Sequence, residues 1–112
     1  MISKKKAEQA VFKALDFILR HQIIDERSSD RGRFVYQYDT VNNKAVKFTC
    51  SWTTAVTAET LLVAHNYTGR EEYLEAAQKA VRYISTLQNF EPFNERMYGA
   101  IREVSTQTDF AH

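Results

Sequence analysis

The fold of this chain is decided by residues 51–88, which read SWTTAVTAETLLVAHNYTGREEYLEAAQKAVRYISTLQ. Between 51 and 67, apolar side chains occupy nearly every angle of a helical wheel, which predicts a helix with neighbours on most sides. Gly69 is suited to end this helix, because glycine adopts the left-handed conformation without strain. The acidic residues Glu71 and Glu72 favour the N-terminus of a new helix over residues 71–87. We therefore expect an antiparallel helical hairpin.

Two polar residues of the first of these helices carry expectations of their own. Ser51 is placed to cap the helix, because its hydroxyl can accept a hydrogen bond from a free amide of the first turn. Glu59 is a carboxylate on an otherwise apolar segment, so it must be paired, protonated or directed into a cavity. A salt bridge is the default interpretation.

Residues 4–23 predict a helix of a different kind, with one apolar side and one polar side. The segment 71–87 has the same amphipathic pattern, and Pro92 with its neighbours ends it in a loop. The apolar residues at spacings of three and four are Ala7, Ala10, Val11, Ala14, Leu15, Ile18 and Leu19 in the first segment and Leu74, Ala77, Val81 and Ile84 in the second.

The residues between the first two helices predict a loop followed by an extended connector. Residues 25–32 are rich in charge and turn formers. The next segment alternates, with Phe34, Tyr36 and Tyr38 on one side. A polar turn at 40–44 then suggests pairing with residues 45–48. We expect a short strand-like connector or a β-hairpin over about 33–48.

The two amphipathic segments align with a constant offset of about 66 residues, which indicates an internal repeat. The connectors correspond as well, since Gly32–Phe34 lies near the position of Gly99–Ile101 and residues 49–52 match those around 106–110. A chance match of common helix formers is the other interpretation. The helical pairs are Ala10 with Ala76, Lys13 with Lys79, Ala14 with Ala80, Phe17 with Tyr83, Ile18 with Ile84 and Gln22 with Gln88.

Such a repeat unit, made of an amphipathic helix, an extended connector and a buried helix, cannot bury its apolar faces alone. We therefore expect either that the chain is a fragment of a longer protein or that a second copy covers the exposed face. The expected partners are accordingly a homo-oligomer or the remainder of a longer chain.

Composition limits the fold to one domain and narrows the partners. A chain of 112 residues with 44% hydrophobic content suits a single domain spanning 1–112. Fifteen basic and 14 acidic residues give a net charge of +1, which favours neither nucleic acid nor an acidic membrane. No apolar run approaches the roughly 18 residues that span a bilayer. If Met1 is the true start, these features predict a soluble cytoplasmic protein.

Residues 51–55, 61–64 and 67–77, which read SWTTA, LLVA and YTGREEYLEAA, are similar to segments of the six-hairpin α/α-toroid enzymes. In those enzymes a turn of the form Thr-Gly-x-x-x-Tyr-Leu joins apolar inner helices to amphipathic outer helices that end in Leu-Gln, as Leu87-Gln88 does here. The resemblance implies a mainly α fold, namely antiparallel helical hairpins of a partial α/α-toroid. It also implies a carbohydrate-active class: glycoside hydrolase, lyase or sugar epimerase.

In these toroids the connectors that lead into the inner helices line one mouth of the barrel. The resemblance therefore points to Asp39, Asp109 and His112 as catalytic candidates and to Tyr36, Tyr38 and Trp52 as candidates for binding a carbohydrate ligand. Aromatic rings stack on sugars, and a carboxylate can act as a general acid or base. Aromatic residues that alternate on a strand are, however, more typical of core packing, and Trp52 is equally suited to anchor its helix.

Other chemistry finds little support in the sequence. His21, His65 and His112 lie on different elements without metal-site spacing, so no metal is expected. The single Cys50 has no histidine nearby in sequence and is typical of a small buried residue. No glycine-rich phosphate loop is present, and no cofactor is expected.

Two functions remain open on the sequence. The first is a fragment or truncated homologue of a carbohydrate-active α/α-toroid enzyme, which is expected to be inactive alone because a complete barrel needs several times this length. The second is a non-enzymatic helical-repeat domain that mediates self-association or partner binding through the apolar face of the helix at 51–67.

Overall fold

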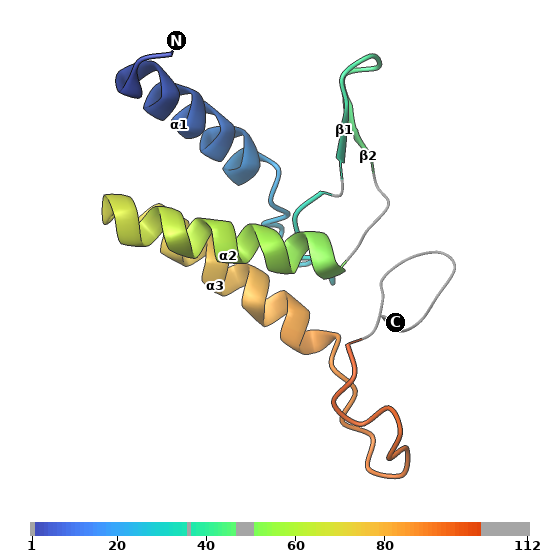
Figure 1. Ribbon diagram of the computed structural model, residues 1–112. Coiled ribbons are helices and arrows are strands. Elements are labelled where there is room, and N and C mark those ends of the chain that lie inside the picture. The colour runs from blue at the N-terminus through green and yellow to red at the C-terminus, as the bar shows by residue number, and fades with distance from the viewer. Residues whose placement is uncertain (1, 36, 47–50, 102–112) are drawn as a thin grey trace.

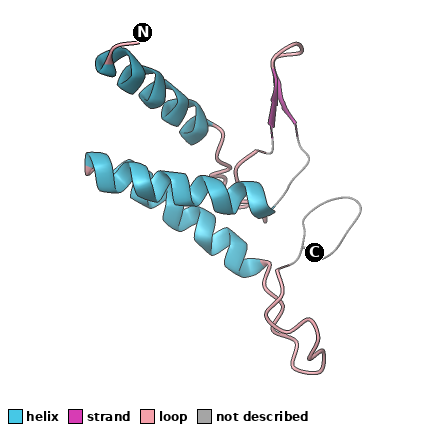
Figure 2. Cartoon of the chain, in the orientation of Figure 1, coloured by secondary structure: helices cyan, strands magenta, loops and turns pink. Residues whose placement is uncertain are grey.

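The computed structural model describes residues 2–35, 37–46 and 51–101 of the chain. The elements follow in the order α1 (Lys4–Arg20), β1 (Gln37–Asp39), β2 (Lys44–Val46), α2 (Ser51–Thr68) and α3 (Glu71–Thr86). The fold is therefore mainly helical, with one short hairpin between the first two helices (Figure 1, Figure 2).

The helices α2 and α3 form the centre of the molecule, where they lie side by side and run in opposite directions (Figure 1). Small side chains at their contact let the two backbones approach, and Leu61 and Tyr73, both fully buried, fill the remaining space. This confirms the helical hairpin expected over 51–67 and 71–87 within one residue at its ends. The small buried residues are Thr54 and Ala58 of α2 and Ala76, Ala77 and Ala80 of α3.

The turn between α2 and α3 forms as the sequence predicts. Gly69 has a φ of 73° and donates its backbone N–H to the carbonyl of His65 at 2.7 Å. The first turn of α3 then carries Glu71 and Glu72, whose charges suit the helix N-terminus. His65 also helps to close the turn, because its Nδ1 lies 3.0 Å from the carbonyl oxygen of Arg70.

The first helix, α1, begins after Ser3, whose hydroxyl accepts a hydrogen bond from the amide of Lys6. It ends at Arg20, three residues before the end expected at 23. The reason lies in the next loop, because Gln22 forms an antiparallel bridge with Phe34 and so leaves the helical conformation. Leu15 is the one buried residue of α1 among the described residues, and Phe12, Ile18 and Leu19 pack around the core beside it.

The strands β1 and β2 form a two-stranded antiparallel sheet in which Gln37, Tyr38 and Asp39 face Val46, Ala45 and Lys44. This is the hairpin expected between residues 33 and 48, in a shorter form. Asn43 takes a φ of 52° in the turn, a conformation that asparagine tolerates better than most residues.

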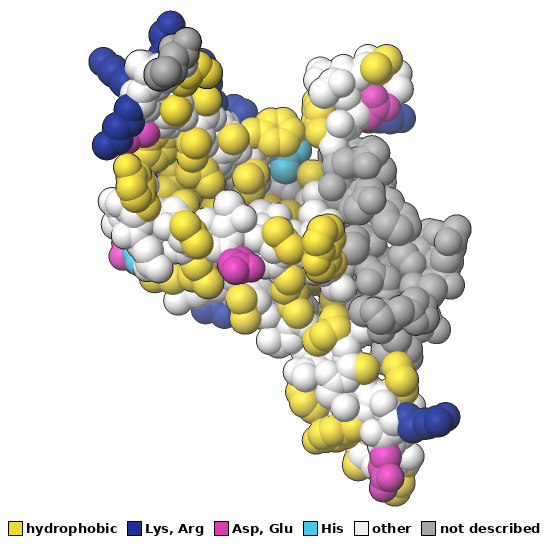
Figure 3. Space-filling model, viewed as in Figure 1, with side chains coloured by type: hydrophobic (Ala, Val, Ile, Leu, Met, Phe, Trp, Pro, Cys, Tyr) yellow, Lys and Arg dark blue, Asp and Glu magenta, His cyan; other side chains and the backbone are white. Residues whose placement is uncertain are grey.

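The helix α2 buries only one stripe of its surface, formed by Ser51, Thr54, Ala58 and Leu61. Its other sides carry apolar residues that remain exposed, and Figure 3 shows them as yellow patches along the middle of the molecule. The expected neighbours on most sides are therefore not supplied by the described part of the chain. Ser51 is the first residue of α2, and the residue before it lies outside the described residues.

None of the described helices is both long enough and apolar enough to cross a lipid bilayer.

Candidate functional site

Three of the six site residues suggested by the sequence, Tyr36, Asp109 and His112, lie outside the described residues. The other three are Tyr38, Asp39 and Trp52. Tyr38 and Asp39 are neighbours on β1, so their side chains leave the strand on opposite sides. Within the described ranges, the hydrogen bonds and ring contacts of Tyr38 and Asp39 go to other residues than Trp52.

Tyr38 packs the hairpin against the end of α1. Its ring makes edge contacts with the rings of Phe17 and His21, at centroid distances of 5.5 and 5.3 Å. Its hydroxyl donates a hydrogen bond to Oδ1 of Asn43 at 2.5 Å. The ring of His21 stacks on Phe17 at 4.2 Å, so the three rings form one cluster. These contacts give Tyr38 a packing role, which was the alternative to sugar stacking.

Asp39 organises the hairpin turn. Its carboxylate accepts hydrogen bonds from the backbone amides of Val41 and Asn42 and from the side-chain amide of Asn42. The side-chain bond from Asn42 is the main cause that lowers the pKa of Asp39, because it stabilises the charged form. A general acid needs a raised pKa, so these bonds suit Asp39 to hold the turn rather than to donate a proton.

Trp52 and Glu59 both lie on exposed sides of α2. The Trp52 side chain is 71% exposed on the first turn of the helix, so it does not anchor the helix in the core. Glu59 is exposed as well. The salt bridge expected for Glu59 is not found among the described residues, where the side of α2 that carries this carboxylate faces outward.

The most distinctive geometry is a loop that occurs twice. We call residues 22–34 the first loop and residues 88–101 the second loop; they follow α1 and α3. Each is closed by an antiparallel bridge, Gln22 with Phe34 and Gln88 with Ile101. Matching backbone hydrogen bonds lie inside each bridge: Ile23 N to Arg33 O at 2.9 Å and Gly32 N to Ile23 O at 2.6 Å in the first, and Asn89 N to Ala100 O at 2.8 Å and Gly99 N to Asn89 O at 2.6 Å in the second.

Glutamine and glycine recur at the same places in both loops. Gln22 donates from Nε2 to the carbonyl of Gly32 at 2.9 Å, and Gln88 donates from Nε2 to the carbonyl of Gly99 at 3.0 Å. The two glycines have φ values of 93° and 85°. The repeat expected from the sequence is thus present in the backbone of the loops, with one extra residue in the second.

The first loop lies on α3, and one side-chain amide connects the two. The Nε2 of Gln22 donates a second hydrogen bond, at 2.9 Å, to the carbonyl oxygen of Ala76. Gly32 approaches the helix so closely that a Cβ there would overlap the carbonyl oxygen of Lys79 and lie 3.2 Å from the Cβ of Tyr83. A helix backbone seldom accepts a contact of this kind unless the approaching residue is glycine.

We call the part of α3 beneath the first loop the covered face; its residues are Ala76, Lys79 and Tyr83. Ala76 is 5% exposed and Tyr83 is 3% exposed, whereas Lys79 is exposed and meets the loop through its backbone carbonyl. The residues of α1 at the same repeat positions, Ala10, Lys13 and Phe17, are all exposed, and we call them the open face. Phe17 keeps 38% of its surface exposed beside Tyr38.

The second loop has no helix on it within the described residues. A Cβ at Gly99 would have only Nε2 of Gln88 nearby, at 3.9 Å, and Gln88 has no second acceptor among the described residues. The loop also exposes three aromatic rings. Phe90 is 58%, Phe93 is 95% and Tyr98 is 57% exposed, and the rings of Phe90 and Tyr98 meet edge to face at 5.9 Å.

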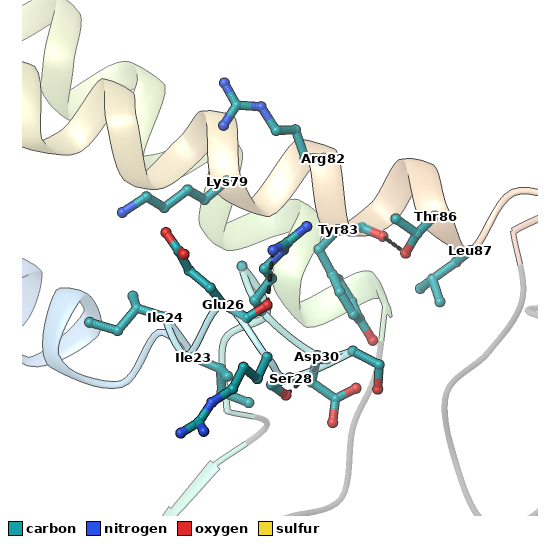
Figure 4. Close-up of a pocket in the computed structure, with 14 residues that line it drawn as sticks. Ile23, Ile24, Glu26, Ser28, Asp30, Lys79, Arg82, Tyr83, Thr86 and Leu87 are labelled. Atoms are coloured by element: carbon teal, nitrogen blue, oxygen red, sulfur yellow. Dashed lines mark hydrogen bonds between the residues drawn. The ribbon is translucent and has the colours of Figure 1, made fainter.

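A cavity of about 760 Å³ lies between the first loop and the C-terminal half of α3. Figure 4 shows Glu26 on the loop side facing Lys79 on α3, whereas Arg82 points away from the loop. Arg31 spans the loop, with Nη1 donating to the carbonyl of Glu26 at 2.9 Å. The lining mixes acidic and basic groups without a convergent set, so this space has the character of a loop contact rather than of a catalytic centre.

Arg33 is buried beside the first loop, with a side chain 9% exposed. Its Nη2 lies 3.5 Å from Oδ2 of Asp30, while its Nε and Nη1 are buried and have no hydrogen-bond partner among the described residues. The second loop has Ala100 at the corresponding position. A buried guanidinium with unmade hydrogen bonds weakens the fold, so the first loop carries a local cost that the second lacks.

Sequence reasoning identified the repeat but not the role of Gln22, Gly32, Gln88 and Gly99. The signal was the matching spacing of glutamine and glycine after each amphipathic helix. In the described ranges, no group of three or more histidine, cysteine, aspartate or glutamate side chains is placed to hold a metal ion. No family model, curated protein or solved structure matches the chain.

Proposed function

We propose that this chain is a non-enzymatic helical-repeat unit that self-associates, with the architecture of a section of an α/α-toroid wall. The observation that carries the proposal is the exposed apolar surface of α2. Five large apolar side chains of this helix are exposed by 40–71%: Trp52, Val56, Leu62, Val63 and Tyr67.

Burial of that surface is a strong driving force for association. A fully buried aliphatic or aromatic side chain stabilises by about 1.5–3 kcal/mol relative to an exposed one. Several large apolar side chains exposed on one helix are typical of an interaction surface. The absence of a catalytic constellation among Tyr38, Asp39 and Trp52 favours association over catalysis.

A groove next to this surface adds to the apolar area. It lies between α1 and α2, which diverge toward the N-terminus of α1 (Figure 1), and has a volume of about 460 Å³. The hydroxyl of Tyr67 donates to Oε1 of Glu8 at 3.2 Å, and the guanidinium of Arg70 lies 5.1 Å from the centre of the Phe12 ring. These two contacts hold α1 at its distance from α2.

The test is a polar substitution on the exposed side of α2. Val63→Gln is expected to weaken self-association measured by sedimentation velocity and to leave the free energy of unfolding within about 0.5 kcal/mol of the original, because Val63 is 63% exposed in one copy. Glu75→Gln, at an exposed position of α3, is the control and is expected to keep the association. A wild-type chain that stays monomeric at millimolar concentration would contradict the proposal.

A second candidate, a carbohydrate-binding role as part of a toroid enzyme, is favoured by the exposed ring of Trp52 at the start of α2. Calorimetric titration with uronic-acid oligosaccharides tests it. Binding is expected to disappear in Trp52→Ala and to persist in Tyr67→Ala, because Tyr67 is equally exposed at the other end of the helix. Equal binding by both variants, or none by the wild type, would exclude this candidate. The isolated chain is expected to hydrolyse none of these oligosaccharides.

A further inference from the structure

We infer that copies of this chain assemble head to tail, with the second loop of one copy seated on the open face of α1 in the next copy. The inference goes beyond the proposed self-association through α2, because it adds a second contact between copies. The surfaces of this second contact, residues 88–101 and the open face (Ala10, Lys13 and Phe17), are distinct from the exposed side of α2.

The contact within one copy supplies the template. The first loop binds the covered face of α3 through the amide of Gln22, which reaches the carbonyl of Ala76, and through Gly32, which lies against the carbonyl of Lys79. Both contacts are made to the helix backbone. A helix that presents its backbone carbonyls in the same register, with a small residue at the position of Ala76, can therefore take the place of α3.

The second loop has the same two contact groups and does not use them within the described residues. Gln88 closes the second loop with one hydrogen bond, to the carbonyl of Gly99, whereas Gln22 makes two. No second acceptor is found for the Gln88 amide among the described residues. Gly99 keeps the left-handed conformation, and among the described residues a Cβ there would meet only Nε2 of Gln88, at 3.9 Å, where Gly32 meets a helix. Within the described residues, the side-chain amide of Gln88 and the backbone of Gly99 are therefore both available for a contact with a helix.

The open face of α1 has the register that the second loop requires. Ala10, Lys13 and Phe17 stand 66 residues before Ala76, Lys79 and Tyr83. In α3, the carbonyl of Ala76 accepts the hydrogen bond from Gln22, and the carbonyl of Lys79 lies against Gly32. The corresponding residues of α1 are exposed. One copy therefore carries both halves of the contact, and the same copy cannot join them in the described arrangement, in which the second loop follows the far end of α3 (Figure 1).

Side chains around the two surfaces support the contact. Phe90, Phe93 and Tyr98 expose aromatic area on the second loop, and aromatic residues are enriched among those that dominate binding energy. The second loop also carries Glu91 and Glu95 against the single cation of Arg96. The helix α1 carries five basic and two acidic side chains, so the long-range electrostatic attraction favours this pairing.

The two surfaces differ, so the contact is heterologous. A copy that uses its second loop still has a free open face, and the assembly grows past a dimer until a ring closes or a filament forms. A symmetric dimer through α2 alone would stop at two copies. The stoichiometry therefore separates the two modes.

The experiment uses two variants that each remove one surface. Gly99→Asn places a side chain where the helix backbone would lie, and asparagine tolerates the positive φ. Ala10→Glu places a charged side chain on the open face. Each variant alone is expected to lose the assembly past a dimer, with an association constant lower by roughly 30-fold or more. An equimolar mixture of the two variants, each also carrying Val63→Gln to weaken the α2 contact, is expected to form a 1:1 complex and stop there, because one intact loop meets one intact face.

Matched controls keep the interpretation specific. Gly69→Asn changes an exposed glycine that also has a positive φ and no atom within 4 Å of a Cβ position. Gln9→Glu adds the same charge beside Ala10 on α1. Both variants are expected to assemble like the wild type. Assembly of either test variant at wild-type strength would overturn the inference. If Val63→Gln abolishes association while Gly99→Asn and Ala10→Glu do not, self-association stands and the head-to-tail contact fails. A mixture that forms no complex also overturns it.

Discussion

The first and second loops share a backbone but differ in what they rest on. Both are closed by a glutamine amide on a glycine carbonyl, and both glycines have a positive φ. The first loop lies on α3, where Gln22 and Gly32 contact the helix backbone. The second loop has no such support among the described residues. The two loops thus share their backbone hydrogen bonds, although among the described residues only the first loop rests on a helix.

The comparison separates local from tertiary contributions to stability. The second loop contributes to the free energy of unfolding through its own local hydrogen bonds. The first loop has the same local bonds and adds contacts with α3. Paired substitutions at corresponding positions measure the difference, because the local effect is common to both members of a pair.

The largest difference is expected at the two glycines. Gly32→Ala is predicted to lower the free energy of unfolding by about 3 kcal/mol, because the new Cβ both strains a positive φ and overlaps the carbonyl of Lys79. Gly99→Ala has only the strain and is predicted to cost about 1 kcal/mol. Urea denaturation followed by circular dichroism measures both, at a protein concentration where the chain is monomeric. Equal losses would show that the first loop does not depend on close contact with α3.

A smaller difference is expected at the two glutamines. Gln22→Ala removes two buried hydrogen bonds and leaves the carbonyls of Gly32 and Ala76 without that donor, which predicts a loss of about 2 kcal/mol. Gln88→Ala removes one partly buried bond and is predicted to cost about 1 kcal/mol. The same denaturation measurement applies. Hydrogen exchange at the amide of Ala80, which hydrogen-bonds the carbonyl of residue 76 in an α-helix, offers a local readout for Gln22→Ala.

Much of the fold follows from sequence patterns that act locally. The apolar spacing and Gly69 predicted the hairpin of α2 and α3, and the alternation around Tyr38 predicted the β-hairpin. The end of α1 was predicted three residues late, since the pattern of apolar residues continues to Ile23 while the backbone leaves the helix to form a bridge at Gln22. The periodicity of apolar residues indicates which residues suit a helix. It does not indicate where hydrogen bonds to another segment end that helix.

The candidate site was less accessible to prediction. The place of Asp39 on a connector suggested a catalytic carboxylate. Its hydrogen bonds with the amides of Val41 and Asn42 instead make it part of the hairpin turn. The role of Gln22 was out of reach, because it depends on the carbonyl of Ala76, 54 residues away. The repeat nevertheless marked these residues in the sequence, since glutamine and glycine recur at matching positions. The structure of the first loop was needed to show that they close the loop and contact a helix.

The smallest expected difference concerns the buried arginine, where the two loops differ in composition. Arg33→Met is predicted to raise the free energy of unfolding by about 1 kcal/mol, because it removes two buried N–H groups without partners and loses only a 3.5 Å ion pair with the partly exposed Asp30. Ala100→Met at the corresponding position of the second loop is the matched substitution and is expected to change stability by less than about 0.5 kcal/mol.

Urea denaturation at low and at 1 M salt completes the test, since salt screening weakens the ion pair between Arg33 and Asp30, which is present only in the wild type. A loss of stability in Arg33→Met would mean that the first loop gains from its buried charge, and the comparison of the two loops would then have to include electrostatics as well as contact with α3.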